Sequence, residues 1–218
     1  MPRRWQAGHG AHDAILNGVS EPIRIIVPHR GLEAAKTRLA PVLDPRERMQ
    51  LAERLLAGVL SVSRQACDEV VVISPSAALA PLVEAAGARL AVQRGMGLNA
   101  GLDEARAEAQ EDGIALLVVL HGDLPNLRAA DVRALAEAAS RPVGVAVAPD
   151  RGGTGTNGLA LRPPGAIGFA FGPGSFARHT QAAQRSGTPL TVVERPGLAF
   201  DLDTPDDLAR WLELGDAA

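Results

Sequence analysis

The sequence predicts an α/β protein with a single domain, in which helices cover both faces of a mostly parallel central sheet. From Ile23 onward, short apolar runs typical of strands alternate with amphipathic segments typical of helices. The run Ile114–Leu120 contains no polar residue, as expected for a central strand covered on both faces. Hydrophobic residues make up 46% of the 218 residues and charged residues 22%, the balance of an ordinary globular domain.

In the first half of the domain, strand and helix signals follow one another closely. The predicted strands are Ile23–Val27, Glu69–Ser74, Arg89–Gln93 and Ile114–Leu120. The predicted helices span Pro45–Ala66, Ala77–Ala86 and Ala100–Glu111. Asp44 followed by Pro45 is a typical helix start, because an aspartate can cap the helix and proline suits its first position.

The second half continues the alternation less regularly. Helices are predicted at Ala129–Ala139, from Ser175 to Arg185, and from Thr204 to Leu214. Strands are predicted at Val143–Ala148, Leu159–Arg162, Leu190–Glu194 and Leu198–Leu202. Residues 1–20 show no sustained periodicity and are predicted to be a disordered leader. Residues 21–218 are then one domain.

Composition excludes several classes of protein. A net charge of −3 provides no basic field for nucleic acid, and no apolar run approaches the roughly 20 residues of a membrane helix. The single cysteine, Cys67, excludes an intrachain disulfide and a multi-cysteine metal site, and it is expected in the core. A reducing, cytoplasmic setting is expected. The oligomeric state stays open, with a homodimer as one option.

A basic loop follows the first predicted strand. Residues 28–39 carry Arg30, Lys36 and Arg38, and Lys36 is the one lysine among 22 basic residues. In so arginine-rich a chain, a retained lysine suggests a role that needs a compact ammonium charge. The loop suits a polyphosphate, with Lys36 as a point charge and Arg38 as a bidentate donor, but a solvated basic loop is the alternative. It does not match the Walker A spacing.

A glycine turn follows the third predicted strand, at Gly95–Asn99. Two readings stay open. The turn could simply begin the next helix, or its glycines, Gly97 among them, could let a nucleobase or ribose approach the backbone closely. Loops at the carboxyl ends of parallel strands form the ligand crevice in such folds, so this turn, the basic loop and the loop after Leu120 are expected together.

Three aspartates are candidate metal ligands. Asp123 follows the central strand, where a carboxylate can hold Mg²⁺ between phosphates, although it could also cap a turn. Asp201 and Asp203 bracket Leu202 at a predicted strand end, so alternation points both to the same side. Two such carboxylates repel each other unless a cation lies between them. Whether Asp201 itself binds the metal stays open.

Two further glycine-rich segments carry hydroxyl groups. They are Asp150–Gly158 and Phe171–Phe176, and the second leads into a helix. Backbone N–H groups at a helix start form an anion site, whereas two surface turns are the alternative. His121 and His179 are expected to be hydrogen-bonded structural residues. The sequence contains no Gly-x-Ser-x-Gly elbow, His-Glu-x-x-His or Cys-x-x-Cys motif.

Together these segments resemble a known family, the phosphoenolpyruvate/2-phospho-L-lactate guanylyltransferases of coenzyme F-420 biosynthesis. The resemblance covers about residues 22–214 and includes the nucleotide-diphospho-sugar transferase-like, Rossmann-like fold of the glycosyltransferase-A-like superfamily. The segments that carry it are Ala35–Ala40, Gly97–Asn99, Gly122–Pro125, Ala148–Asn157, Phe169–Phe176 and Asp201–Leu208. The first loop departs from the family pattern, with His29-Arg30-Gly31 in place of a valine-lysine-proline type of run.

The resemblance implies transfer of GMP from GTP to the phosphate of a small phosphorylated carboxylic acid, with Mg²⁺ as cofactor. For this activity the residues predict a GTP site at Arg30, Lys36, Gly97 and Asn99, with catalysis by Lys36, Arg38 and Asp123. They predict a metal site at Asp123, Asp201 and Asp203, and an acceptor site at Thr156, Gly172 and Ser175. Phosphoenolpyruvate is the predicted acceptor, with 2-phospho-L-lactate, 3-phospho-D-glycerate or a molybdopterin-type acceptor as alternatives. A non-catalytic GTP-binding protein is the alternative from another class.

Overall fold

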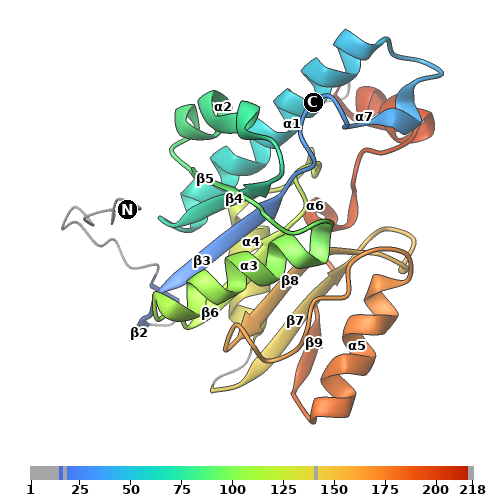
Figure 1. Cartoon of the computed structure of the whole chain (residues 1–218). Coiled ribbons are helices and arrows are strands. Elements are labelled where there is room, and N and C mark those ends of the chain that lie inside the picture. The colour runs from blue at the N-terminus through green and yellow to red at the C-terminus, as the bar shows by residue number, and fades with distance from the viewer. Residues whose placement is uncertain (1–14, 17–18, 140–141, 216–218) are drawn as a thin grey trace.

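One seven-stranded sheet organises the computed structural model, which describes residues 15–16, 19–139 and 142–215 (Figure 1). Its strands lie side by side in the order β5 (Arg89–Val92), β4 (Val70–Ser74), β3 (Ile23–Pro28), β6 (Leu116–Leu120), β8 (Thr156–Arg162), β7 (Gly144–Pro149) and β9 (Leu190–Val192). Only β8 runs antiparallel to its neighbours β6 and β7, and the other four pairings are parallel. The predicted mostly parallel sheet is confirmed.

The most hydrophobic run of the sequence lies at the centre of this sheet. Strand β6 is fourth of the seven, and all of its residues are buried. Both faces of the sheet are covered at this position. In its parallel neighbour β3, for example, Ile25 and Val27 are buried on one face and Ile26 on the other. The predicted central position of this strand is confirmed.

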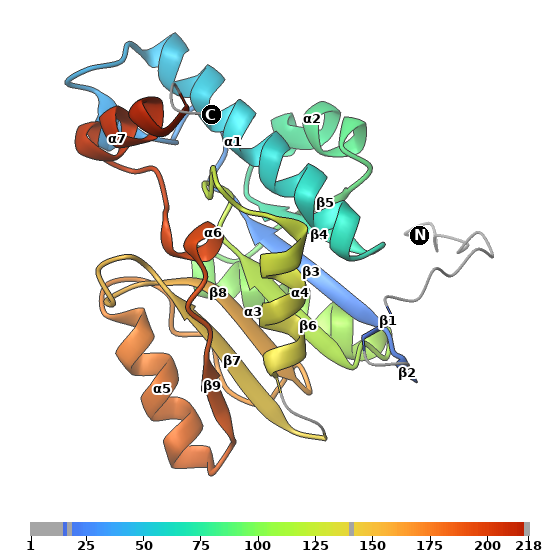
Figure 2. The same ribbon diagram turned by 180° about the vertical axis from the view of Figure 1, so that it is seen from behind.

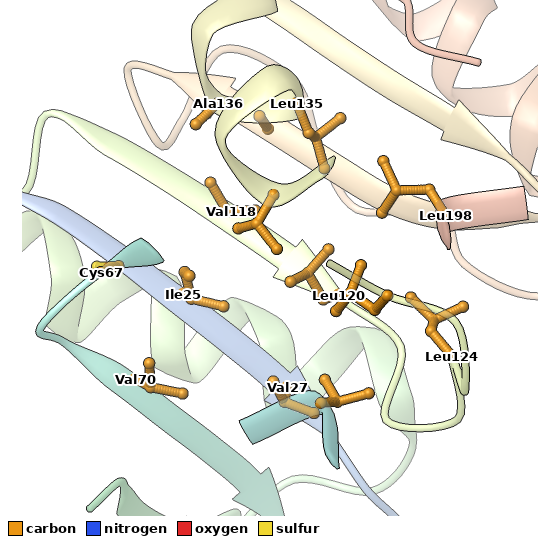
Figure 3. Close-up of a cluster of buried hydrophobic side chains, with 14 of the residues drawn as sticks. Ile25, Val27, Cys67, Val70, Val118, Leu120, Leu124, Leu135, Ala136 and Leu198 are labelled. Carbon is orange, nitrogen blue, oxygen red and sulfur yellow. The ribbon is translucent and has the colours of Figure 1, made fainter. Parts of the chain in front are cut away.

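Helices cover both faces of the sheet. One face packs against α1 (Pro45–Ala66), α2 (Ala80–Ala85), α4 (Ala129–Ala138) and α6 (Pro196–Ala199), which Figure 2 shows from their own side. Figure 3 shows part of this core, where Leu135 of α4 and Leu198 of α6 approach Val118 and Leu120 of β6. The opposite face packs against α3 (Leu98–Glu111) and α5 (Ser175–Ser186). The two apolar layers together form the core of the domain.

The start of α1 follows the sequence prediction closely. Asp44 accepts a hydrogen bond from the Glu47 backbone N–H at 2.8 Å, and Glu47 accepts one from the Asp44 N–H at 2.8 Å. Such a reciprocal cap satisfies two backbone donors that the first helical turn leaves unpaired. The loop before α1 therefore ends at Asp44.

A small third core joins the loop that follows β3 to the segment that precedes the last helix. Leu39, from the short 3-10 helix Thr37–Leu39, packs with Leu55, Phe200 and Leu202, all of them buried. Helix α7 (Pro205–Gly215) covers this cluster with Leu208 and Trp211. Leu39 lies three residues after Lys36, and Leu202 directly precedes Asp203. This core therefore holds two distant chain segments against each other.

One prediction about regular structure is wrong. Leu198–Leu202 is not a strand: Pro196–Ala199 forms the short helix α6, and proline occupies its first turn. The apolar pattern misled because Leu198, Phe200 and Leu202 are buried without any sheet pairing, Leu198 in the large core and the other two in the small one. Within the predicted leader, β1 (Ile15–Leu16) and β2 (Val19–Ser20) pair as antiparallel strands. The rest of that leader prediction, residues 1–14 and 17–18, lies outside the described residues.

Candidate functional site

A pocket of about 490 Å³ opens where strands β3 and β6 end. The loops that follow β3, β5 and β6 line it, together with Asp203. The predicted site residues that line it are Arg30, Lys36, Arg38, Gly97, Asp123 and Asp203. The expectation that these loops meet at the carboxyl edge of the sheet is confirmed.

Lys36 forms the centre of this pocket wall. Its Nζ donates to Asp123 Oδ2 at 2.6 Å and to Asp203 Oδ1 at 2.9 Å, and its side chain is 6% exposed. Lys36 is also the one non-glycine residue with a left-handed backbone (φ 55°) in the part of the chain that the structure describes. A lysine in this conformation is strained, and the two ion pairs hold it there. The cation between Asp123 and Asp203 is therefore the lysine itself, and it does not lie between Asp201 and Asp203 as the predicted cation would.

Electrostatics keeps this group charged. Burial opposes a charge on Lys36, but Asp123 and Asp203 outweigh it and hold the pKa of Lys36 above its ordinary value. Burial would likewise raise the pKa of Asp123, but Lys36 and then His121 outweigh it and hold that pKa below its usual range. Asp123 is thus an anion at neutral pH.

The acidic residues fit a divalent cation held partly by substrate. Asp123 Oδ1 is buried and accepts no hydrogen bond from any described residue, so one carboxylate oxygen is free to ligate. Among the described residues, no group of three or more His, Cys, Asp or Glu side chains is placed to form a metal cage. Mg²⁺ commonly uses one or two carboxylates and takes its other ligands from phosphates and water. The donor set is compatible with that mode of binding.

Asp201 lies near the other two carboxylates, but not for the reason the sequence suggested. Its Oδ1 accepts a hydrogen bond from Asn157 Nδ2 at 3.2 Å, and the strand that predicted its direction is absent. Burial raises the pKa of Asp201, and the neighbouring charges of Asp123 and Asp203 add to this effect, while the Asn157 bond opposes it. Asn157, which also donates to the Leu198 carbonyl at 3.0 Å, is a site residue that sequence reasoning missed.

The two predicted arginine cations, Arg38 and Arg30, are both exposed at the pocket. Arg38 is 73% exposed and lies 3.7 Å from Asp203 Oδ2, so its guanidinium can reach a ligand. Arg30 is exposed on the pocket rim. His29, which precedes Arg30 in the sequence, accepts a hydrogen bond from the Gly31 N–H at its Nδ1 (3.0 Å), and burial lowers its pKa to about 4. His29 is therefore neutral at physiological pH.

The glycine turn divides into two parts. Gly97 lines the pocket with φ +92°, a conformation that side chains rarely adopt. Asn99 turns to the loop before α5: its Nδ2 donates to the Phe171 carbonyl at 3.1 Å, and its Oδ1 accepts from the Phe171 N–H at 2.9 Å. Both amide atoms of Asn99 are thereby used by protein, and Asn99 is not among the residues lining the pocket. The structure gives it a positioning contact.

Thr156, Gly172 and Ser175 come together beside the pocket. Thr156 Oγ1 lies 3.0 Å from His179 Nδ1, and the Ser175 N–H donates to the Gly172 carbonyl at 3.0 Å. Gly172 has φ +118°, so this loop requires glycine there. Phe171 packs its ring against His121, which lines the pocket, with 5.6 Å between the ring centroids. The predicted acceptor residues thus adjoin the pocket without lining it.

Asp207, in the first turn of α7, holds the backbone of Asp203 in position. One oxygen of Asp207 accepts hydrogen bonds from the Thr204 N–H at 2.9 Å, the Thr204 hydroxyl at 2.7 Å and the Asp203 N–H at 3.2 Å. Its other oxygen accepts from Arg151 at 3.0 Å. The cap at Thr204 therefore also orients a site residue, and Arg151 is a second residue that the sequence did not single out.

Solved structures define the fold first. The chain superposes with a TM-score of 0.74 on a protein from Desulfovibrio desulfuricans described as a nucleotide-diphospho-sugar transferase, covering 88% of this chain and 87% of that one at 18% identity. It superposes with a TM-score of 0.59 on glucosyl-3-phosphoglycerate synthase from Mycobacterium tuberculosis, solved with Mg²⁺ and UDP, covering 87% and 74% at 15% identity. The fold is that of nucleotide-diphospho-sugar transferases.

Sequence relatives then define the family. The family described as "Guanylyl transferase CofC like" matches residues 23–217, and the chain belongs to it. It is 48% identical over 189 residues to phosphoenolpyruvate guanylyltransferase of Rubrobacter xylanophilus, covering 85% of this chain and 91% of that protein. It is 45% identical over 185 residues to the protein of the same name from Sphaerobacter thermophilus, covering 84% and 89%. Within the described residues, no helix has the length and apolarity needed to cross a membrane.

Proposed function

We propose that this protein transfers GMP from GTP to the phosphate of phosphoenolpyruvate, giving enolpyruvoyl-2-diphospho-5'-guanosine and diphosphate. The observation that carries the proposal is Lys36 between Asp123 and Asp203 at the carboxyl edge of the sheet, in a chain of the CofC-like family. The relatives at 48% and 45% identity carry the name of this activity.

The reaction needs no nucleophile from the protein. An oxygen of the acceptor phosphate attacks the α-phosphorus of GTP, a new P–O bond forms, and the bond to the bridging oxygen of the β-phosphate breaks. Diphosphate leaves with the bonding electrons. Catalysis of such a transfer depends on alignment and on neutralising charge. Cations and carboxylates line the pocket, and among the described residues that line it no hydroxyl is hydrogen-bonded to a histidine, which suits this chemistry.

The nucleotide half of the site is assigned to the charged loops. Lys36 would exchange its carboxylate partners for the β- and γ-phosphates, and Arg38 and Arg30 would neutralise the leaving diphosphate from the pocket rim. Gly97 would leave space for the nucleoside beside the start of α3. Asn99 would act indirectly, since its amide holds Phe171.

The metal is assigned to the acidic residues. Asp123 and Asp203 would hold Mg²⁺, with Asp201 as a further candidate ligand. Bound there, the ion would neutralise phosphate charge during transfer. Asp207 would keep Asp203 in place through the Asp203 backbone N–H. The same fold in glucosyl-3-phosphoglycerate synthase was solved with Mg²⁺ and UDP, so it admits an ion and a nucleotide together.

The acceptor is assigned to Thr156, Gly172 and Ser175. Phosphoenolpyruvate carries a phosphate and a carboxylate, which need hydrogen-bond donors in little space. Two hydroxyl groups and the backbone N–H groups around Gly172 would supply them. This side also carries a positive charge, because the Arg178 guanidinium lies next to Gly172, where an added Cβ would be 3.3 Å from its Nη2.

The test is product formation. The protein is incubated with GTP, Mg²⁺ and phosphoenolpyruvate, 2-phospho-L-lactate or 3-phospho-D-glycerate in separate reactions, and products are read by mass spectrometry. Asp203→Asn serves as the matched inactive control. We expect the phosphoenolpyruvate adduct and diphosphate. An adduct with another acceptor alone would reassign the substrate, and GTP binding without diphosphate release would contradict the enzyme assignment.

Two further assignments accompany this function. The single cysteine supports a reducing, cytoplasmic setting. A homodimer is the second, and light scattering of the purified protein in dilute solution tests it directly.

A further inference from the structure

His179 makes two hydrogen bonds to two different segments. It lies on α5 and is fully buried. Its Nε2 is 3.0 Å from the Ala170 backbone nitrogen, which donates to it, and its Nδ1 is 3.0 Å from Thr156 Oγ1. Its ring also meets Phe171 edge to face, with 4.9 Å between centroids. His179 therefore links the start of β8 to the loop that precedes α5.

These contacts determine which ring nitrogen carries the proton. A backbone N–H can only donate, so Nε2 must be the unprotonated acceptor. Burial lowers the pKa of His179 to about 4, so the ring is neutral at physiological pH and has one N–H. That hydrogen is consequently on Nδ1, and it is donated to Thr156 Oγ1. A neutral imidazole with Nε2 blocked leaves no other arrangement.

The direction of this bond decides what Thr156 can do. Because Thr156 Oγ1 accepts from His179, its own hydroxyl hydrogen points elsewhere. No described residue accepts that hydrogen. The opposite arrangement, in which Thr156 donates to Nδ1, would place a proton on Nε2 against the Ala170 N–H. Thr156 is thus held as a donor without an acceptor among the described residues.

We propose that His179 is a positioning residue that fixes the hydroxyl of Thr156 as a hydrogen-bond donor toward the anionic acceptor substrate. The inference rests on the proposed function for the identity of that acceptor. Asn99 holds the loop before α5 through both backbone groups of Phe171, next to the Ala170 N–H that donates to His179, so the imidazole bonds to a segment that is itself held in place. The bound species is a small phosphorylated carboxylate, represented in the test by phosphoenolpyruvate.

The first test reads the proton directly in the unliganded wild-type protein. Long-range ¹⁵N–¹H NMR distinguishes Nδ1–H from Nε2–H imidazoles. We expect His179 to be Nδ1–H. His29, whose Nδ1 accepts from the Gly31 N–H, should be Nε2–H in the same spectrum and serves as the internal reference. An Nε2–H form of His179 would overturn the proposal, whether or not any variant folds.

The second test uses two amide side chains that replace different ring nitrogens. Asparagine places its amide near Nδ1 and can still donate to Thr156, whereas glutamine reaches the Nε2 position only. His179→Gln should lower kcat/KM for phosphoenolpyruvate by about 10- to 100-fold, the loss of one hydrogen bond to a charged group. His179→Asn should retain most of it, and the KM for GTP should not change in either variant.

A double-mutant comparison separates positioning from general damage. In a Thr156→Val background the hydroxyl is gone, so His179→Asn and His179→Gln should become equal in kcat/KM for phosphoenolpyruvate. Thr156→Ser keeps the hydroxyl and should preserve the difference. Equal activity of the two His179 variants in the wild-type background, or an undiminished difference in the Thr156→Val background, would overturn the proposal. Failure of the proposed function is separate, since wild type would then form no adduct while the tautomer is still read.

Discussion

The two sides of this site are held by different kinds of interaction. On one side, Lys36 is bound by two carboxylates through charge, in a strained backbone conformation. On the other, Thr156, His179 and Asn99 are joined through neutral hydrogen bonds. The charged side lines the pocket, whereas the neutral side is buried next to it.

This difference indicates how each side responds to a ligand. An ion pair can exchange one anionic partner for another, so Lys36 can leave its carboxylates for phosphates when a cation replaces it. The neutral contacts that His179 makes with Ala170 and Asn99 makes with Phe171 are already matched and have little reason to rearrange, because an unmatched buried group costs about 1–3 kcal/mol. The nucleotide side is therefore adjustable, and the acceptor side is preformed.

Removing a carboxylate from the charged side should have the largest effect. Asp123→Asn and Asp203→Asn should each lower Mg²⁺-dependent kcat by roughly 10²–10³-fold, comparable to loss of a major electrostatic contact. Circular dichroism should show an intact fold in both. Turnover close to wild type in either variant would remove that residue from the site.

Changing the shape of the cation while keeping its charge should have the next largest effect. Lys36→Arg should lower kcat/KM about 10- to 100-fold, because a planar fork does not fit a 6% exposed position between two carboxylates. Steady-state kinetics with GTP varied measures it. Wild-type kinetics in Lys36→Arg would mean that the lone lysine is a compositional coincidence.

Lys36 and the metal should also compete in the absence of nucleotide. If the ammonium occupies the space between the carboxylates, Lys36→Met should bind Mg²⁺ about tenfold or more tightly than wild type, since one neutralising cation is gone. Isothermal titration with Mg²⁺ alone measures this. Weaker or unchanged binding would show that the exchange does not occur at these carboxylates.

The neutral side predicts a pH dependence of stability. Burial lowers the pKa of His179 to about 4 from 6.5, so between these values the unfolded chain binds more protons and stability falls as pH falls. The loss attributable to His179 reaches up to about 3 kcal/mol near pH 4. Urea unfolding at pH 7.5 and 5 should show a smaller drop for His179→Gln than for wild type, with His29 supplying the remaining part. Equal drops in the free energy of unfolding would mean that His179 takes up a proton as readily in the folded protein as in the unfolded chain.

Most of the fold could be predicted because local signals agreed with tertiary structure. The Asp44 cap, the apolar run at Leu116–Leu120 and the Thr204 cap are all local. Leu198–Leu202 could not be predicted, because its leucines are buried by packing without pairing. Periodicity alone cannot distinguish these two ways of burying an apolar residue.

The site shows a similar division. The residue types predicted phosphate binding by Lys36 and metal binding by Asp123 and Asp203, but the direct ion pairs between them depend on a left-handed Lys36 and on Leu39 and Leu202 in the third core. Asn99 was predicted to contact nucleotide, yet its amide holds Phe171. Sequence spacing does not show where an amide points. Asn157 and Arg151 lie in a segment that carries the family resemblance, but no signal in that segment showed that they contact Asp201 and Asp207.

The most direct test of the two-sided account is separate saturation with GTP and with phosphoenolpyruvate for Gly172→Ala, Thr156→Val and Ser175→Ala. A side chain at Gly172 requires a strained φ of +118° in the acceptor loop, and each lost hydroxyl removes a hydrogen bond to a charged group worth about 1.5–3 kcal/mol. The account predicts that all three variants lose kcat/KM for phosphoenolpyruvate while the KM for GTP stays at the wild-type value. A collapse of GTP affinity with normal dependence on phosphoenolpyruvate would reverse the assignment of the two sides.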